Sequence, residues 1–359
     1  MTWRYHLLAL PSRQWLDRDL HPLTGVSITE CVNAPASISG LIPIEHRIPG
    51  LVEWGAMLIA EQDGKKPIAA IVDRLERDGQ QLSIESGGFS MYPTGMPWLG
   101  EDYAGVQVDP LDVVRLAWEH LQSYDDGDLR VTVDSTKSPV RVGTEPEQKE
   151  FTTDDGEEVS FESGPFRLAW WNTDDLGRVI DDLATDTPFE YREESAWDGE
   201  EITHRLRLGY PKLGARRENL RFEVGVNVTV PPPLAPGEYA SEVQLFGAGE
   251  GSSKVRAHTT QDTGRLRRVY TSTDKSLTSK TAAGRAARPM LDRLAGSPLK
   301  FDSVQITDHP NARPGTYEPG DEIRIVGDAG WAELDHWCRI MAITTTPEDG
   351  AISLEVETL

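Results

Sequence analysis

The sequence predicts a mainly β protein with an α+β part: two β-barrel domains and an α+β module inserted between them. Short runs that alternate apolar and polar residues fill the first and last thirds of the chain, and Gly, Pro, Asp and Asn separate them. Such runs are typical of all-β barrels and sandwiches. Two amphipathic helical stretches among strands lie in the middle, which favours an α+β module. A chain of 359 residues is also too long for one compact core.

The first β-barrel domain is predicted at residues 1–108. Its opening run, MTWRYHLLAL, alternates Trp3 and Tyr5 against Arg4 and His6, and PSRQWLDRD follows it. A secretory signal peptide would end in small residues at a cleavage site, so this run predicts a strand and no export signal. Further strands are expected at GVSITECV, ASISGLIP, GAMLIAEQ, PIAAIVDR and QLSIES.

The α+β module is predicted at residues 109–233. Asp109 is a good helix N-cap, Pro110 suits the first helical position, and apolar residues recur at helical spacing through VDPLDVVRLAWEHLQSY. A second helix with one apolar face is expected at DDLGRVIDDLATD. Strands are expected at LRVTVD, PFEYREE, ITHRLRLG and LRFEVGVNVTV. The triple proline Pro231 to Pro233 is stiff and extended, so it predicts a linker.

The second β-barrel domain is predicted at residues 234–359. Strands are expected at EVQLFG, KVRAHTT, LRRVYTST, DEIRIVG, HWCRIMAI and AISLEVETL. A helical segment is expected near residues 276–295. Pro289 is expected to interrupt or kink this segment, because proline cannot donate the helical hydrogen bond.

The charge of the chain is acidic and uneven. The formal net charge is −23, which argues against a whole surface that binds nucleic acid or anionic lipid. Residues 251–300 hold eleven Lys or Arg against three Asp, so this basic segment carries a net +8 and the rest of the chain is more acidic. Cys31 and Cys338 lie near opposite ends, which argues against a disulfide framework and favours synthesis in a reducing compartment.

The stretch EVQLFGAGEGSSKVRA raises the question of a phosphate-binding loop. Such a loop needs a helix after its glycines, because free backbone N–H groups and the helix dipole hold the phosphate. Here the β-favouring run KVRAHTT follows, and the spacing of Gly247, Gly249, Gly251 and Lys254 fits neither phosphate-loop pattern. The stretch therefore predicts a hairpin or bulged turn.

No other stretch predicts a catalytic, cofactor-binding or metal site. His336 and Cys338 in DHWCRI would share one face of a strand, but no second ligand pair is near them in sequence. Carboxylate clusters in DDG, DLATD and DGEE are expected on the solvated loops of a chain with 59 acids, and no G-x-S-x-G or H-E-x-x-H motif occurs. Ten tryptophans are many for a chain of this length, and core or interface anchors are their favoured interpretation. The set that includes candidate sugar-stacking platforms is Trp98, Trp118, Trp170, Trp171, Trp197, Trp331 and Trp337.

Three passages carry motifs that span the chain from about Leu7 to the C-terminus. The first is VDPLDVVRLAWEHLQSYDDGDLRVTVDSTKSPVRVG, a helix, a strand and a Ser-rich segment that closes on V-G. The second is ITHRLRLGYPKLGARRENLRFEVGVNV, with a G-Y-P-x-L-G core and the ending G-x-N-V. The third joins EVQLFGAGEGSSKVRAH with EPGDEIRIVG and HWCRIMAIT. Together they resemble the hub or minor tail proteins of siphophages, the long-tailed phages, in the branch common among phages of actinobacteria.

That resemblance implies a tail-tip (baseplate) hub with two tail-tube-like β-barrels per subunit, assembled as a homotrimer that matches a hexameric tail tube. The implied partners are further copies of the chain, distal tail or tail-tube proteins, the tape measure protein and other minor tail proteins. The implied location is the tail tip of the virion, after synthesis in the host cytoplasm and without a membrane anchor. The implied role is structural, with no enzymatic activity and no cofactor.

Within such a ring, the basic segment is expected to form a subunit interface against acidic neighbouring surface. The candidate residues are Lys254, Arg256, Arg265, Arg267 and Arg268. Two other interpretations stay open: a face toward a lumen through which DNA passes transiently, and a solvated face. The alternative function is a carbohydrate-binding or cell-wall-degrading tail protein that uses exposed tryptophans and paired carboxylates.

Overall fold

The computed structural model describes residues 2–152, 158–171, 175–230, 235–236, 238–249, 251–275, 277, 279–296, 299–330 and 332–359. It divides into two compact units. Unit 1 comprises Met1–Pro231, Val304–Glu357 and Leu359, and unit 2 comprises Pro232–Ser303 and Thr358. The linker expected at Pro231 to Pro233 lies outside the described residues. The domain division expected at residues 108 and 233 stays a prediction.

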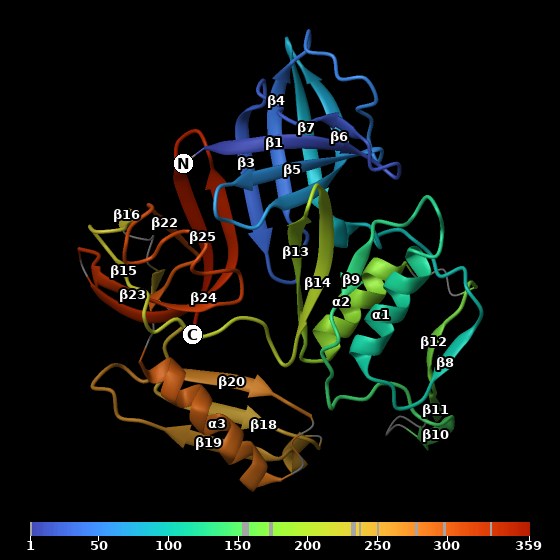
Figure 1. Cartoon of the computed structure of the whole chain (residues 1–359). Helices are drawn as coiled ribbons and strands as arrows, with labels where there is room; N and C mark the ends of the chain where they lie inside the picture. Colours follow the sequence, from blue (N-terminus) through green and yellow to red (C-terminus); the bar gives the residue numbers. More distant parts are fainter. Residues whose placement is uncertain are drawn as a thin grey trace. The chain divides into compact units, whose positions relative to one another are not determined.

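A 13-stranded sheet forms most of unit 1 (Figure 1). Its path of hydrogen-bonded neighbours is β16-β22-β25-β24-β3-β4-β7-β6-β5-β1-β2, and β23 pairs with both β24 and β15. The strands are β1 (Trp3–Ala9), β2 (Trp15–Asp17), β3 (Thr24–Cys31), β4 (Ser37–Pro43), β5 (Ala56–Gln62), β6 (Ile68–Asp78), β7 (Gln81–Gly88), β15 (Phe222–Glu223), β16 (Val228–Val230), β22 (Ser303–Ile306), β23 (Glu322–Asp328), β24 (Glu333–Thr346) and β25 (Ala351–Thr358).

Strands from the first and last thirds of the chain join in this one sheet. β3 pairs antiparallel with β24, with Cys31 opposite Ala342 and Ile28 opposite Thr345. Figure 1 shows β1 and β5 crossing the direction of β3, β4 and β7, so the sheet folds back over a core that includes Leu7 and Ile38, both fully buried. The mainly β class with an α+β part is confirmed. The path begins at β16 and ends at β2, so the described strands do not close into a ring.

The middle of the chain adds two helices and smaller sheets to unit 1. α1 (Pro110–Leu121) begins as expected, since Asp109 Oδ1 accepts from Leu111 N at 3.0 Å and Pro110 takes the first helical position. α2 (Leu176–Asp186) has Asp175 as its N-cap. The remaining elements are η1 (Phe89–Met91), β8 (Tyr103–Gly105) with β12 (Phe166–Leu168), β9 (Val131–Val133) with β14 (Glu201–Gly209) and β13 (Glu190–Asp198), and the hairpin β10 (Glu147–Thr152) and β11 (Glu158–Ser163).

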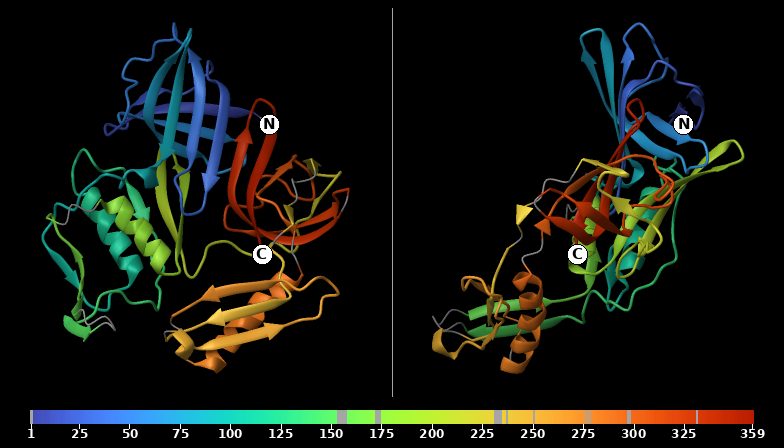
Figure 2. Two further views of the ribbon diagram at one scale, coloured as in Figure 1. Left: turned by 180° about the vertical axis from the view of Figure 1, so that it is seen from behind. Right: turned by 90° about the vertical axis from the view of Figure 1, so that its left-hand side faces the viewer.

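Unit 2 is a three-stranded sheet with one helix. The sheet order is β19-β18-β20, from β18 (Glu242–Phe246), β19 (Arg256–Thr260) and β20 (Val269–Thr273), beside the short pair β17 (Ala235–Pro236) and β21 (Leu299–Lys300). α3 (Lys280–Ala295) packs along one face of this sheet (Figure 2) and buries Ala283, Ala287 and Leu291. The expected interruption at Pro289 is wrong. The helix continues through this residue because its apolar stripe stays packed on the strands to both sides of the proline.

Candidate functional site

The basic segment gathers its candidate side chains around the β18-β19-β20 sheet of unit 2. Arg267 donates two hydrogen bonds to Glu242 Oε2, at 2.9 and 2.6 Å, and Glu242 is 6% exposed. Arg256 Nη2 donates to Gln244 Oε1 at 3.0 Å, and the Arg265 guanidinium lies 5.1 Å from the centre of the Tyr239 ring. The five candidates, Lys254, Arg256, Arg265, Arg267 and Arg268, are all exposed.

These contacts give the arginines different roles. Hydrogen bonds from Gln244 and Arg267 lower the pKa of Glu242, so Arg267 stabilises unit 2 itself. Arg265 and Arg268 are exposed; Arg265 contacts the Tyr239 ring, and Arg268 bonds to Ser241 through its backbone N–H and C=O groups. Arg265 and Arg268 are therefore the better candidates for contact with another molecule.

The glycine stretch is a hairpin loop, as expected. β18 and β19 pair antiparallel, and Gly247 N donates to Val255 O at 2.7 Å while Val255 N donates to Ala248 O at 2.8 Å. Gly249 has φ +105°, a conformation that favours glycine. Only the three-residue helix η2 (Gly251–Ser253) precedes the strand, so the helix N-terminus that would hold a phosphate is missing from this part of the described chain.

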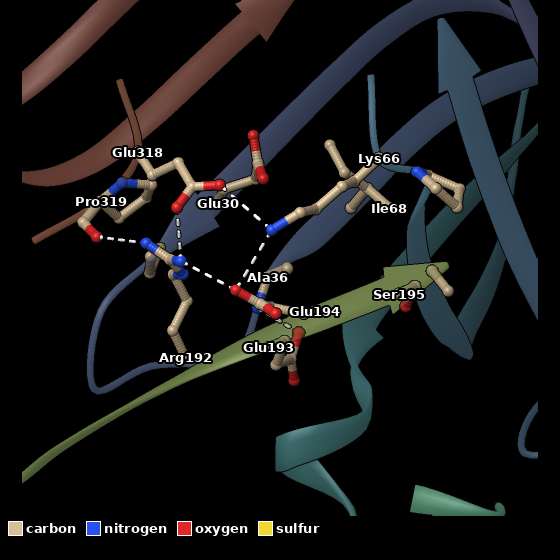
Figure 3. A pocket seen from close by; sticks show the side chains of 13 residues that line it. Glu30, Ala36, Lys66, Ile68, Arg192, Glu193, Glu194, Ser195, Glu318 and Pro319 are labelled. Atoms are coloured by element: carbon tan, nitrogen blue, oxygen red, sulfur yellow. Dashed lines mark hydrogen bonds and ion pairs between the residues drawn. The ribbon is translucent and has the colours of Figure 1, made fainter. Parts of the chain in front are cut away.

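A cluster of charged side chains lies in a small pocket of unit 1 (Figure 3). Arg192 Nη2 contacts Glu194 Oε1 at 3.0 Å and Glu318 Oε2 at 2.6 Å, while Arg192 Nη1 donates to Pro319 O at 2.8 Å. Lys66 Nζ bridges the same two carboxylates at 3.2 and 3.3 Å. The network ties β13 to the chain before β6 and to the chain before β23. The network leaves no local signal in the sequence, because its members lie up to 252 residues apart.

The Glu193 carboxylate holds β13 against the corner between β7 and η1. It accepts from Ala36 N at 3.1 Å and from Ser90 N. Gly88 allows this approach, because a Cβ there would lie 1.9 Å from Glu193 Oε2. Burial raises the pKa of Glu193 to about 7, against the two backbone hydrogen bonds that lower it. For Glu194, burial is outweighed by Arg192 and Lys66, and its pKa is lowered.

Glu193 should make the free energy of unfolding fall as pH rises from about 4.5 toward 7. The folded chain then binds more protons than the unfolded chain, in which the pKa of this carboxyl has its ordinary value of 4.5. The stabilisation is therefore complete below pH 4.5 and is lost as the pH rises through the folded pKa of about 7. Glu193→Gln should remove this fall. Urea titrations at several pH values measure it, and Glu194→Gln is the control, because its lowered pKa gives a slope of the opposite sign. If the free energy of unfolding of Glu193→Gln changes with pH as it does in the parent chain, Glu193 is not the group that causes the fall.

The G-Y-P-x-L-G motif is a docking loop inside unit 1. Asp321 is 1% exposed, and its carboxylate accepts from Ala215 N at 2.8 Å, Arg217 Nε at 2.7 Å and Glu318 N at 3.0 Å. Gly214 has φ +87°, and a Cβ there would lie 2.1 Å from the Gly320 carbonyl oxygen. The hydrogen bonds of Asp321 and the close approach of Gly214 to Gly320 thus hold the segment after β14 against the turn before β23.

Neighbouring polar residues add an ion pair and further hydrogen bonds to this contact between segments. Glu190 pairs with Arg339 and also accepts from Leu213 N at 2.7 Å. In the G-x-N-V ending, Asn227 is 0% exposed, accepts from Glu223 N at 2.8 Å and donates to Arg221 O at 2.9 Å. Both motifs therefore position backbone, and neither brings reactive groups together.

Two further arrangements have the residue types of a reactive site. Ser195 Oγ lies 3.0 Å from His204 Nδ1, but burial lowers the pKa of His204 to about 4, and His204 is only 1% exposed. His204 Nε2 is buried and has no hydrogen-bond partner among the described residues, so the pair lacks the orienting acid of a catalytic triad. The described residues also hold no group of three His, Cys, Asp or Glu suited to a metal ion. None of the described helices is long and apolar enough to cross a membrane.

The tryptophans divide into buried and exposed members. Trp98 and Trp118 are 7% and 1% exposed and belong to the core, as favoured from the sequence. Trp170 and Trp171 are 62% and 50% exposed, with ring centres 5.5 Å apart and planes at 86°. This exposed pair follows β12. Its two rings offer aromatic surface for contact with another molecule.

No protein-family model matches the chain, and no curated protein matches it. Solved structures do match. The 43 kDa tail protein of prophage MuSo2 from Shewanella oneidensis is similar with a TM-score of 0.54 at 12% identity, over 99% of this chain and 98% of that chain.

Two further matches are of the same kind. Prophage tail protein gp18 from Listeria monocytogenes has a TM-score of 0.50 at 12% identity, over 98% of this chain and 94% of that one. The tail protein from Neisseria meningitidis has a TM-score of 0.50 at 12% identity, over 100% and 97%. The fold of this chain is thus similar to that of these three tail proteins over 98% or more of its length.

Proposed function

We propose that the chain is a non-enzymatic structural protein of a phage tail, located in the virion. The observation that carries this proposal is the shared fold, which covers 99% of the chain and 98% of a prophage tail protein. The motif residues agree with a structural role, since Asp321, Gly214 and Asn227 fix backbone geometry. The chain would associate with other tail components, because a tail subunit functions only in an assembly.

The finer proposal is a tail-tip hub: a ring of copies, in the form of a trimer, that joins the tail tube to distal receptor-binding or penetration proteins and contacts the tape measure protein. It rests on the sequence motifs that resemble hub proteins of actinobacterial phages. The charge distribution supports self-association, since the basic segment at +8 belongs to a chain of net −23.

Reversing the exposed charges of the basic segment should weaken this assembly. Arg265→Glu together with Arg268→Glu places two acids where the acidic surface of a neighbour is expected. Like charges across an interface cost several kcal/mol, so association should weaken about 100-fold or more at low salt, with a smaller effect at high salt. Light scattering over a range of concentration measures the association.

Arg267→Glu is the matched comparison. It breaks the pair with Glu242 inside unit 2, so it should lower thermal stability more than the double variant does. If the double variant assembles as the parent chain does, the basic segment is not an interface.

A second candidate function is favoured by Trp170 and Trp171. Two tryptophans exposed by half or more offer faces on which a sugar ring stacks, as in a carbohydrate-binding tail protein. Calorimetric titration with host-envelope polysaccharide tests it. Binding that is lost in Trp170→Ala would favour this function, and no binding by the parent chain would remove it.

A further inference from the structure

The loop between β4 and β5 presents two large apolar side chains to solvent. Val52 is 56% exposed and Trp54 is 52% exposed. Tryptophan is among the residues most enriched where binding energy is concentrated in protein interfaces. The loop therefore has the apolar centre of a contact with another molecule.

Backbone contacts hold Trp54 in place. Its N–H donates to Val72 O at 2.7 Å. Glu53 beside it accepts from Leu75 N through Oε1 at 2.9 Å, so the loop is fastened to β6. Trp54 also has φ +60°, a conformation that is uncommon for a residue with a large side chain. A side chain on a fixed backbone loses little freedom when it binds, which favours affinity.

Carboxylates surround this loop. Burial raises the pKa of Asp73, and the nearby carboxylates of Glu85 and Glu53 raise it further. Arg74 offsets part of this charge, since it pairs with Glu76 at 2.6 Å and contacts Glu85 at 3.7 Å. The four carboxylates outnumber this arginine, so the rim beside the two apolar side chains is negative. A positively charged partner would relieve the repulsion.

The chain contains a turn of the opposite charge with its own exposed apolar residue. Leu266 lies between Arg265 and Arg267 in the connection from β19 to β20, and it is 89% exposed. Arg268 fixes the end of this turn, because its N–H donates to Ser241 Oγ at 3.1 Å. A leucine flanked by arginines complements an apolar pair with a carboxylate rim, since interfaces combine an apolar centre with a polar border of matching charge.

We propose that the Trp54 loop (residues 51–55) of one copy binds the Leu266 turn (residues 265–268) of a second copy. Leu266 would lie on Trp54, and the arginines of the turn would face the carboxylates around the loop. This inference rests on the proposed ring of copies and names a contact that would close it. Two different surfaces meet in this contact, as a ring requires, whereas a two-fold dimer joins one surface to itself.

The first experiment reverses the charges on both sides of the contact. Glu76→Lys with Glu85→Lys should weaken association about 10-fold or more at low salt. Arg265→Glu with Arg268→Glu acts on the opposite side. A chain with all four substitutions again places opposite charges together, so its association should recover about 10-fold from either double variant. Light scattering measures association, and circular dichroism confirms that each variant is folded. If the fourfold variant associates no better than the double variants, the inference is overturned.

The second experiment distinguishes the Trp54 loop from another acidic, aromatic surface. Trp54→Ala should weaken association at least about 10-fold, because truncating a central tryptophan is among the costliest changes in an interface. Tyr124→Ala is the matched control, since Tyr124 is 44% exposed and is followed by Asp125 and Asp126. It should associate as the parent chain does. A loss as large in Tyr124→Ala as in Trp54→Ala, or no loss in Trp54→Ala, would overturn the choice of surface.

The third experiment joins the two segments across copies. Chains with Val52→Cys and chains with Val269→Cys are co-expressed with different tags, and a short bis-maleimide is added to the purified mixture. Native thiols give little background, because burial raises the pKa of Cys31 to about 11 and Cys338 is buried. A cross-linked dimer that carries both tags should form, and it should be much weaker when either variant is expressed alone.

The outcomes separate this inference from the proposed ring. If copies associate but neither the charge recovery nor the cross-link appears, the contact is wrong and the ring stands. If a single chain with both cysteines links internally and the co-expressed chains do not link, the turn contacts the loop within its own copy and the inference is overturned. If the chain is a monomer at every concentration and no cross-link forms, both proposals fail.

Discussion

Asp321→Ala should lower the free energy of unfolding by roughly 3 kcal/mol, because part-buried N–H donors left without an acceptor cost about 1–3 kcal/mol each. The Asp321 carboxylate accepts from Ala215 N and Glu318 N, and it also pairs with Arg217. Alanine would leave both N–H groups facing a cavity. Urea denaturation of the purified chain measures the loss.

Asp63→Ala is the control for this variant. Asp63 pairs with Arg4, but its side chain is 78% exposed, so water replaces the lost contact and the change should stay within about 0.5 kcal/mol. Equal losses in the two variants would mean that the docking of the G-Y-P-x-L-G loop does not stabilise unit 1.

Gly214→Ala should destabilise unit 1 by at least about 3 kcal/mol, the sum of a positive-φ cost and an overpacking cost. The new Cβ would lie 2.1 Å from the Gly320 oxygen and 2.2 Å from the Gly320 carbon. Both are backbone atoms, so no side-chain rotation relieves the contact. The whole loop would have to move away from the turn before β23.

Gly225→Ala separates the two costs. Gly225 has φ +80°, but nothing lies within 4 Å of its added Cβ, so only the conformational cost of about 1–2 kcal/mol should appear. The difference between the two variants measures the steric part. If both lose the same stability, the close approach of Gly214 to Gly320 is wrong.

Local signals in the sequence located much of the fold. The cap at Asp109 and the proline after it identified the start of α1, and the run after the glycine stretch identified a hairpin loop in place of a phosphate site. These features depend on residues close together in sequence. Pro289 is the exception, because tertiary packing of α3 overrode the local preference of proline.

Contacts between distant segments were not predictable in this way. The pairing of β3 with β24 joins residues more than 300 positions apart, and alternating patterns do not specify which strand lies beside which. The cluster of Lys66, Arg192 and Glu318 likewise combines residues that resemble ordinary surface charges when each is taken alone. For the basic segment, sequence composition identified the region, and only the structure separated Arg267, which pairs with Glu242, from Arg265 and Arg268.

The mass of the purified chain in solution, measured by light scattering over a range of concentration and salt, tests the central claim most directly. The hub proposal predicts a stable trimer, or a trimer that appears when tail-tube components are added. A chain that remains a monomer at every concentration and with those components would contradict it.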